Sequence, residues 1–172
     1  MQSYLVPSTI SNPATSAFVP AQLGDVWRDN LEFLASPPTC IVSQSASQLV
    51  PNNARTTIEF DVEHRDNHRI HSTVTEPGSL LLRTGGWWKV WCAGYTVADT
   101  DGVRVLYCVQ NGYTLPYGSP FTGDPHGTVD AGLISVAHLV VTADTEIHWE
   151  LLHNAANDLY VNFRAGAQFL SR

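Results

Sequence analysis

The densest group of chemically active side chains lies in the short segment 63–71. It holds three histidines and two carboxylates, His64, His68, His71, Glu63 and Asp66. Imidazole and carboxylate groups are common ligands of transition metals. The spacing would suit a helix, but the segment follows a predicted strand and is polar, so we expect a loop. A metal site and a solvated polar loop are the alternatives, and we favour the loop.

The acidic turn at Asp99-Thr-Asp101-Gly102 resembles the start of a calcium-binding loop. The remaining ligands of a full EF-hand loop are absent from the sequence that follows, so we expect a tight turn. Three further histidines, His138, His148 and His153, fall within predicted strands. Structural, hydrogen-bonded roles are expected for them.

No established catalytic motif occurs in the chain. A Gly-x-Ser-x-Gly sequence, a P-loop, a zinc-protease motif and a dinucleotide-binding fingerprint are all missing. We therefore expect a protein that is not an enzyme and that needs no cofactor and no metal.

Charge and length narrow the classes of partner. The chain has 172 residues, 9 basic against 16 acidic, and a net charge of −7. Its few basic residues are scattered, which disfavours nucleic-acid binding. It has no run of eighteen apolar residues and no charged-then-apolar leader, so we expect neither membrane insertion nor a standard secretion signal. The length suits one core with an extension.

The chain has three cysteines, Cys40, Cys92 and Cys108. An odd count without close pairs favours reduced, partly buried thiols in a protein made in a cytosol. Cys92 and Cys108 form the one pair that could be bridged.

The rest of the chain is organised around the segment 87–97. Its residue types favour a strand, yet Trp87, Trp91 and Tyr95 share one face while apolar residues also occupy the other. Both faces are therefore expected to be covered, one by the core and one by another layer or subunit. The turn at 99–102 and the apolar segment 103–110 predict a hairpin. The sequence leaves open which face meets the core.

Short strands separated by turn residues predict an all-β antiparallel sandwich. We expect eight strands in two sheets of four, at 40–45, 56–62, 79–83, 87–97, 103–110, 134–142, 146–153 and 159–170. The last is the clearest, because every second residue from Leu159 to Phe169 is apolar. Tyr160 lies on the opposite face.

Three regions are predicted: an extended arm at 1–20, a helix with a Pro-Pro linker at 21–38, and a head at 39–172. Prolines exclude a long helix in the arm. The arm nevertheless carries apolar residues expected to dock on a partner: Tyr4, Leu5, Val6, Ile10 and Phe18. A disordered tail is the alternative.

An amphipathic helix is predicted at 21–35. Its apolar stripe follows spacings of four, four and three residues and comprises Leu23, Trp27, Leu31 and Leu34. Pro37-Pro38 ends the helix. One short helix cannot bury its stripe alone, so we expect it to pack on the head or on symmetry-related copies.

Several segments together resemble a known family. They are VPNNARTTIEFDVEHRDNHRIH at 50–71, GGWWKVWCAGY, GVRVLYCVQNG, LVVTADTEIHWELLHNAAN and a C-terminal strand ending AQFL. This series resembles the globular head of the first complement component and the tumour-necrosis-factor-like jelly rolls, especially those of bacteriophage virion proteins. The resemblance spans about 21–172. One departure is that 64–71 replaces the family's usual Asp-Thr-Asp-Gly-Met-His turn.

The resemblance implies a ten-stranded jelly roll that forms a homotrimer and acts by binding rather than catalysis. The two strands missing from our count would then fall within 51–77 and 113–129. The aromatic residues Trp87, Trp91, Tyr95 and Tyr160 are the expected trimer interface.

The expected function is that of a structural virion protein made in the bacterial cytoplasm. It would decorate a bacteriophage capsid and bind the major capsid protein through its arm. The alternative is a receptor-binding head at a tail fibre or spike, recognising host carbohydrate or protein.

Overall fold

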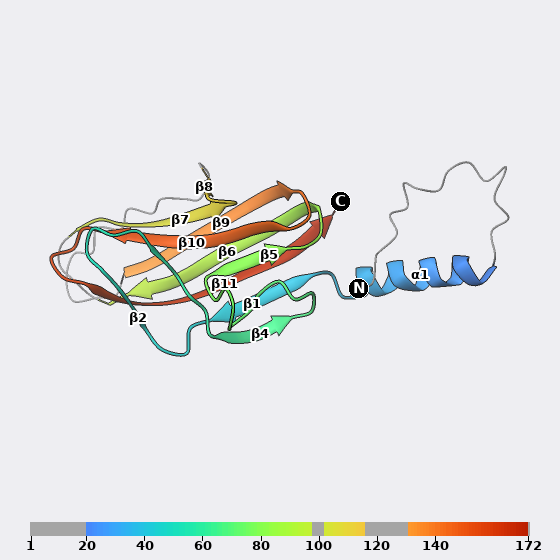
Figure 1. Ribbon diagram of the computed structural model, residues 1–172, viewed down its shortest axis with the longest axis horizontal. Helices are drawn as coiled ribbons and strands as arrows, with labels where there is room; N and C mark the ends of the chain where they lie inside the picture. Colours follow the sequence, from blue (N-terminus) through green and yellow to red (C-terminus); the bar gives the residue numbers. More distant parts are fainter. Residues whose placement is uncertain (1–19, 98–101, 116–130, 172) are drawn as a thin grey trace. The chain divides into compact units, whose positions relative to one another are not determined.

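The computed structural model describes residues 20–97, 102–115 and 131–171. The chain divides into two compact units, 1–37 and 38–172, which are described separately (Figure 1). In the first unit, α1 (Pro20–Ala35) covers the predicted helix and begins one residue earlier. Proline suits a first helical position because that N–H has no intrahelical partner. None of the described helices is long and apolar enough to span a membrane.

The second unit, the head, is built from strands that all pair antiparallel. The strands in its described part are β1 (Thr39–Ser43), β2 (Gln48–Val50), β3 (Thr56–Thr57), β4 (Val62–Asp66), β5 (Ser79–Leu82), β6 (Gly86–Thr96), β7 (Arg104–Gln110), β8 (Tyr113–Thr114), β9 (Ala131–Val141), β10 (Thr145–His153) and β11 (Leu159–Ser171). The predicted all-β sandwich is confirmed.

The strands form two sheets, which we call sheet A and sheet B. Sheet A has six strands in the order β4-β1-β11-β6-β9, with β2 also paired to β11 (Figure 1). Sheet B has five strands in the order β3-β10-β7-β8, with β5 also paired to β10. The prediction of two four-stranded sheets is therefore wrong, because β2 and β8 are too short to show periodicity. The predicted strand 56–62 is in fact two separate strands, β3 and β4, in different sheets.

The core lies between the two sheets. It is filled by every second residue of each strand, those whose side chains face inward. Trp88, Val90 and Cys92 of β6 point inward, as do Leu106 and Cys108 of β7, and all are buried. Trp88 packs edge-on against Phe169 at 5.4 Å between ring centroids. The Trp88 indole N–H also donates to the Thr84 carbonyl at 2.8 Å, so its polar atom is satisfied in the core.

The hairpin predicted from 87–97 and 103–110 is wrong. β6 pairs with β9 and β11 in sheet A, whereas β7 pairs with β10 and β8 in sheet B. The chain therefore crosses from one sheet to the other between these strands, and the turn residues Asp99 and Asp101 lie outside the described residues. A true hairpin joins β7 and β8 through Asn111-Gly112, both with positive φ (47° and 80°), as a two-residue turn requires.

Candidate assembly surface

The outward residues of β6 form the centre of an apolar surface. Because side chains alternate along a strand, Trp87, Trp91 and Tyr95 face away from the core that Trp88 helps to fill. Trp87 is 48% exposed and Tyr95 is 42% exposed. The structure thus decides which face of this strand meets the core, a point that the sequence left open.

Neighbouring strands extend this surface on both sides of β6. On β9, Val140 lies opposite Trp87 and Val136 lies opposite Trp91, and both are exposed. On β11, Gly166 lies opposite Trp91. A Cβ at Gly166 would lie 2.8 Å from the Trp91 Nε1 atom, so the glycine makes room for the indole. The result is an apolar surface over β6 and β9, beside which β11 contributes a glycine.

The same face continues to the far end of β11. Tyr160 is exposed there, beside Leu49 of β2, which is its partner in the register. The Tyr160 carbonyl accepts a hydrogen bond from the Val97 N–H at 2.8 Å, which holds the end of β6 against β11. All four residues of the predicted interface, Trp87, Trp91, Tyr95 and Tyr160, therefore lie on the outer face of sheet A. Whether they meet another chain stays a prediction.

Strands β6 and β11 of sheet A also carry two cations on their outward faces, Lys89 and Arg164. Lys89 of β6 lies opposite His138 of β9 and Gln168 of β11, and Arg164 lies opposite Ala93. The strands β1, β2, β6, β9 and β11 contain no Asp or Glu, and the acidic residues of sheet A, Glu63 and Asp66, lie on its edge strand β4. In a chain with net charge −7, this face is locally basic as well as apolar.

Three contributors to the surface were missed by the sequence analysis: Ile134, Val136 and Val140 of β9, all exposed. The sequence did contain a pattern that could have identified them. Like the segment 87–97, β9 has apolar residues on both of its faces. The same two-faced pattern in two adjacent strands would have identified the surface.

The histidine cluster at 63–71 does not converge on one point. His64 lies in β4 rather than in a loop, and its Nε2 atom is 2.8 Å from the Ser43 hydroxyl. His71 is buried, with Nδ1 3.0 Å from Glu63 Oε1 and Nε2 3.1 Å from the Pro77 carbonyl. Among the described residues, no group of three or more His, Cys, Asp or Glu could hold a metal ion.

Asp66 organises this segment instead. Its carboxylate accepts backbone N–H groups of His68 at 3.2 Å, Ile70 at 2.9 Å and His71 at 2.8 Å. These bonds fix the turn and occupy the oxygen atoms that a metal would need. Burial lowers the pKa of His68, while the nearby Asp66 charge acts in the opposite direction.

The other strand histidines have different surroundings. His153 is buried, with Nε2 2.9 Å from the Val50 carbonyl. His148 lies on the outer face of sheet B between Glu146 and Glu150, at 3.3 and 3.6 Å. His138 is exposed on sheet A.

The three cysteines are buried free thiols. Cys92 of sheet A and Cys108 of sheet B point into the same core, so they face across the sandwich and not across a hairpin. Burial raises the pKa of Cys108 to about 12 and raises that of Cys92 well above its usual value. These thiols therefore stay protonated and unreactive while the head is folded.

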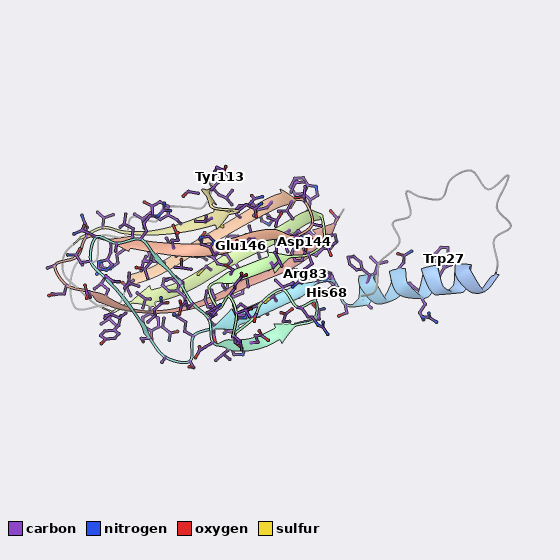
Figure 2. The ribbon with its side chains drawn as sticks, viewed as in Figure 1. Trp27, His68, Arg83, Tyr113, Asp144 and Glu146 are labelled. Carbon is purple, nitrogen blue, oxygen red and sulfur yellow. The ribbon has the colours of Figure 1, made fainter. Side chains whose placement is uncertain are left out.

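The predicted arm residues Tyr4, Leu5, Val6, Ile10 and Phe18 lie outside the described residues. On α1, three residues of the predicted stripe, Trp27, Leu31 and Leu34, are exposed, and Figure 2 shows the Trp27 side chain standing off the helix. The fourth, Leu23, lies within α1, but its side chain is outside the described set.

No protein-family model and no curated protein matches the chain. Solved structures do. The chain is similar to the globular domain of zebrafish complement 1qA protein, with a TM-score of 0.58 and 12% identity, covering 78% of this chain and 98% of that one. It also matches Eiger TNF from S. frugiperda (TM-score 0.48, 16% identity, 78% and 95% covered) and murine APRIL (TM-score 0.49, 8% identity, 76% and 99% covered).

The likeness covers almost the whole of the complement domain and more than three quarters of this chain. The predicted fold class is therefore confirmed: the head is a jelly roll of the type shared by the complement globular head and tumour necrosis factor.

Proposed function

We propose that the protein is a homotrimer whose heads assemble through the outer face of sheet A, and that it acts by assembly and binding rather than by catalysis. One observation carries this proposal. Large apolar side chains are exposed side by side on the outward faces of β6 and β9, although the inward faces of both strands are already buried in the core. Large exposed apolar patches mark interaction sites in soluble proteins.

The charges on this face favour a ring of three over a twofold dimer. In a twofold dimer the same patch meets itself, which would bring Lys89 and Arg164 of one copy toward those of the other. In a closed ring, each patch meets a different surface of its neighbour. The acidic remainder of the chain can then provide the complementary charge.

The test compares two tyrosines on different sheets. Tyr95 is on the outer face of sheet A, and Tyr113, 79% exposed, is on β8 of sheet B (Figure 2). Tyr95→Glu should convert the trimer to monomers, because a charge buried in a dry interface costs several kcal/mol. Tyr113→Glu should leave the trimer intact in sedimentation velocity. A Tyr95→Glu protein that still sediments as a trimer would exclude this face as the interface.

At a finer level, we propose that the trimer decorates a bacteriophage capsid. The resemblance to phage virion jelly rolls and the apolar residues of the arm at 1–20 support this proposal. A threefold protein matches the threefold positions where capsid subunits meet. Three linked arms could add strands or apolar contacts, and each bound arm raises the effective concentration of the others.

Copy number and truncation test the capsid role. Particles should carry the protein in numbers that match their capsid threefold positions, whereas a few copies per particle would favour the tail-fibre alternative. A trimer lacking 1–20 should stay folded and fail to bind particles. If the truncated trimer binds as well as the intact protein, the arm is not the anchor.

A further inference from the structure

The apolar stripe of α1 is exposed along the last turns of the helix. Trp27 and Leu31 are each 62% exposed and Leu34 is 75% exposed. A 16-residue helix is marginal in water unless its apolar side is packed. The stripe therefore requires a partner.

The charges of α1 exclude two classes of partner. The helix carries Asp25, Asp29 and Glu32 against one basic residue, Arg28. An acidic helix is repelled by the negative surface of anionic lipid and by the phosphate backbone of nucleic acid. A protein surface remains, and the apolar stripe is the part of α1 that would meet it.

The connection between α1 and the head points to copies of the same chain. Only Ser36 and Pro37 separate Ala35 from Pro38, whose carbonyl accepts the Phe169 N–H at 2.9 Å. The three steps from Ala35 to Pro38 span at most about 11 Å. Pro38 leads directly into β1 of sheet A, the sheet that we propose as the trimer interface. Each α1 is thus tethered to the head by two residues.

We propose that α1 packs against the α1 helices of two other copies to form a parallel three-helix bundle. This inference rests on the proposed trimer. Once three heads assemble, the short tethers hold three exposed stripes at a high effective concentration, so packing needs no further encounter. Cyclic symmetry makes the helices parallel and places each residue at the same height as its own copies.

The spacing of the stripe fits this arrangement. Its steps of four, four and three residues bring Leu34 back to the face of Leu23 after eleven residues. An eleven-residue period gives 3.67 residues per turn, so the stripe stays on one side along the helix instead of drifting around it. A seam of this kind suits packing along the full length of parallel helices.

Disulfide trapping tests the bundle in the full-length protein. In Leu34→Cys, the new thiols of neighbouring copies would lie together at the centre of the bundle. Mild oxidation should link two of the three chains, giving a covalent dimer on a non-reducing gel at a yield unchanged by dilution. The background is low because Cys40, Cys92 and Cys108 are buried.

Glu32→Cys is the matched control, since position 32 lies on the far side of the helix by its spacing from the stripe. Wild type and Glu32→Cys should stay unlinked. Leu31→Cys, on the stripe, provides a second variant if Leu34→Cys does not fold.

Sedimentation of the same samples separates the two proposals. A protein that sediments as a trimer without linking at either position 31 or 34 would overturn the bundle and leave the head trimer standing. Equal linking at position 32 would also contradict an ordered seam. A monomer would overturn both proposals.

Discussion

The outer faces of the two sheets of the head are built from different kinds of side chain. On sheet A, exposed aromatic and branched aliphatic residues of β6 and β9 lie before and after the pair Lys89 and His138 along the two strands. On sheet B, Arg55 forms an ion pair with Glu150 at 2.9 Å and donates to the Thr114 hydroxyl at 3.0 Å. Its guanidinium also lies 4.1 Å over the Tyr107 ring.

The polar network of sheet B continues along β10. The Ser79 hydroxyl donates to Glu146 at 2.6 Å, and His148 lies within ion-pair distance of both Glu146 and Glu150. Figure 2 shows Glu146 among the side chains of the head. Several outer polar side chains of sheet B are therefore paired within one chain, whereas sheet A leaves aromatic and branched aliphatic side chains exposed on β6 and β9. The two sheets share one core but differ in the outer side chains that they leave exposed, and this difference is the basis for the proposed assembly surface.

The largest expected contrast is between two adjacent tryptophans of β6. Trp88→Ala should lower the free energy of unfolding by about 3–5 kcal/mol, because Trp88 is buried in the core and a cavity would remain. Trp87→Ala should leave the fold intact and weaken the trimer. Urea unfolding and sedimentation of both variants make the comparison. Equal loss of stability in the two variants would show that the faces are not distinct.

A second prediction concerns the core that the sheets share. The pKa of Cys108 is raised to about 12 by burial, while an unfolded thiol ionises near its ordinary value of 9.0. Since the folded-state pKa is the higher one, this stability is fully present below pH 9 and is lost as pH rises from 9 toward 12. From pH 9 to 10.5, the thiol should account for a loss of about 2 kcal/mol.

Cys108→Ala is the control for this prediction. Its unfolding free energy should fall less steeply over the same pH range, because the other ionising groups are unchanged. Identical slopes for the variant and the wild type in urea unfolding would mean that Cys108 is not desolvated in the folded head.

The smallest expected effect lies on the outer face of sheet B. Arg55→Ala should lower stability by about 0.5–1 kcal/mol, because exposed ion pairs and cation–π contacts are individually weak. It should leave the sedimentation coefficient unchanged. Thermal unfolding and sedimentation velocity provide the two measurements. Dissociation of the trimer in this variant would place sheet B in the interface.

The sequence was sufficient for features that depend on local periodicity. The inward run from Leu159 to Phe169 and the two-faced pattern at 87–97 both lie where alternation predicts, in β11 and β6. The position of α1 followed equally from its stripe and from the two prolines that end it. Alternation sorts the aromatic residues of a strand onto its two faces, but only the structure shows which face of 87–97 is outward.

Pairing between strands was not identifiable in this way. Adjacent segments joined by a turn suggested a hairpin of 87–97 with 103–110, but both edges of β6 are taken by the longer partners β9 and β11. The strands β6 and β7 are both apolar on their inward side. Hairpin partners and strands of facing sheets share this pattern, so it does not distinguish between them. Likewise, His64 and His71 are near in sequence, yet they have separate partners in Ser43 and Glu63.

The molar mass of the intact protein in solution tests the central claim most directly. Sedimentation equilibrium across a micromolar concentration series should give three times the mass of one chain, because the apolar face of sheet A is covered only when a ring of three copies closes. A monomer throughout the series would contradict the account, since the face would then be exposed to water. A dimer would contradict the threefold arrangement.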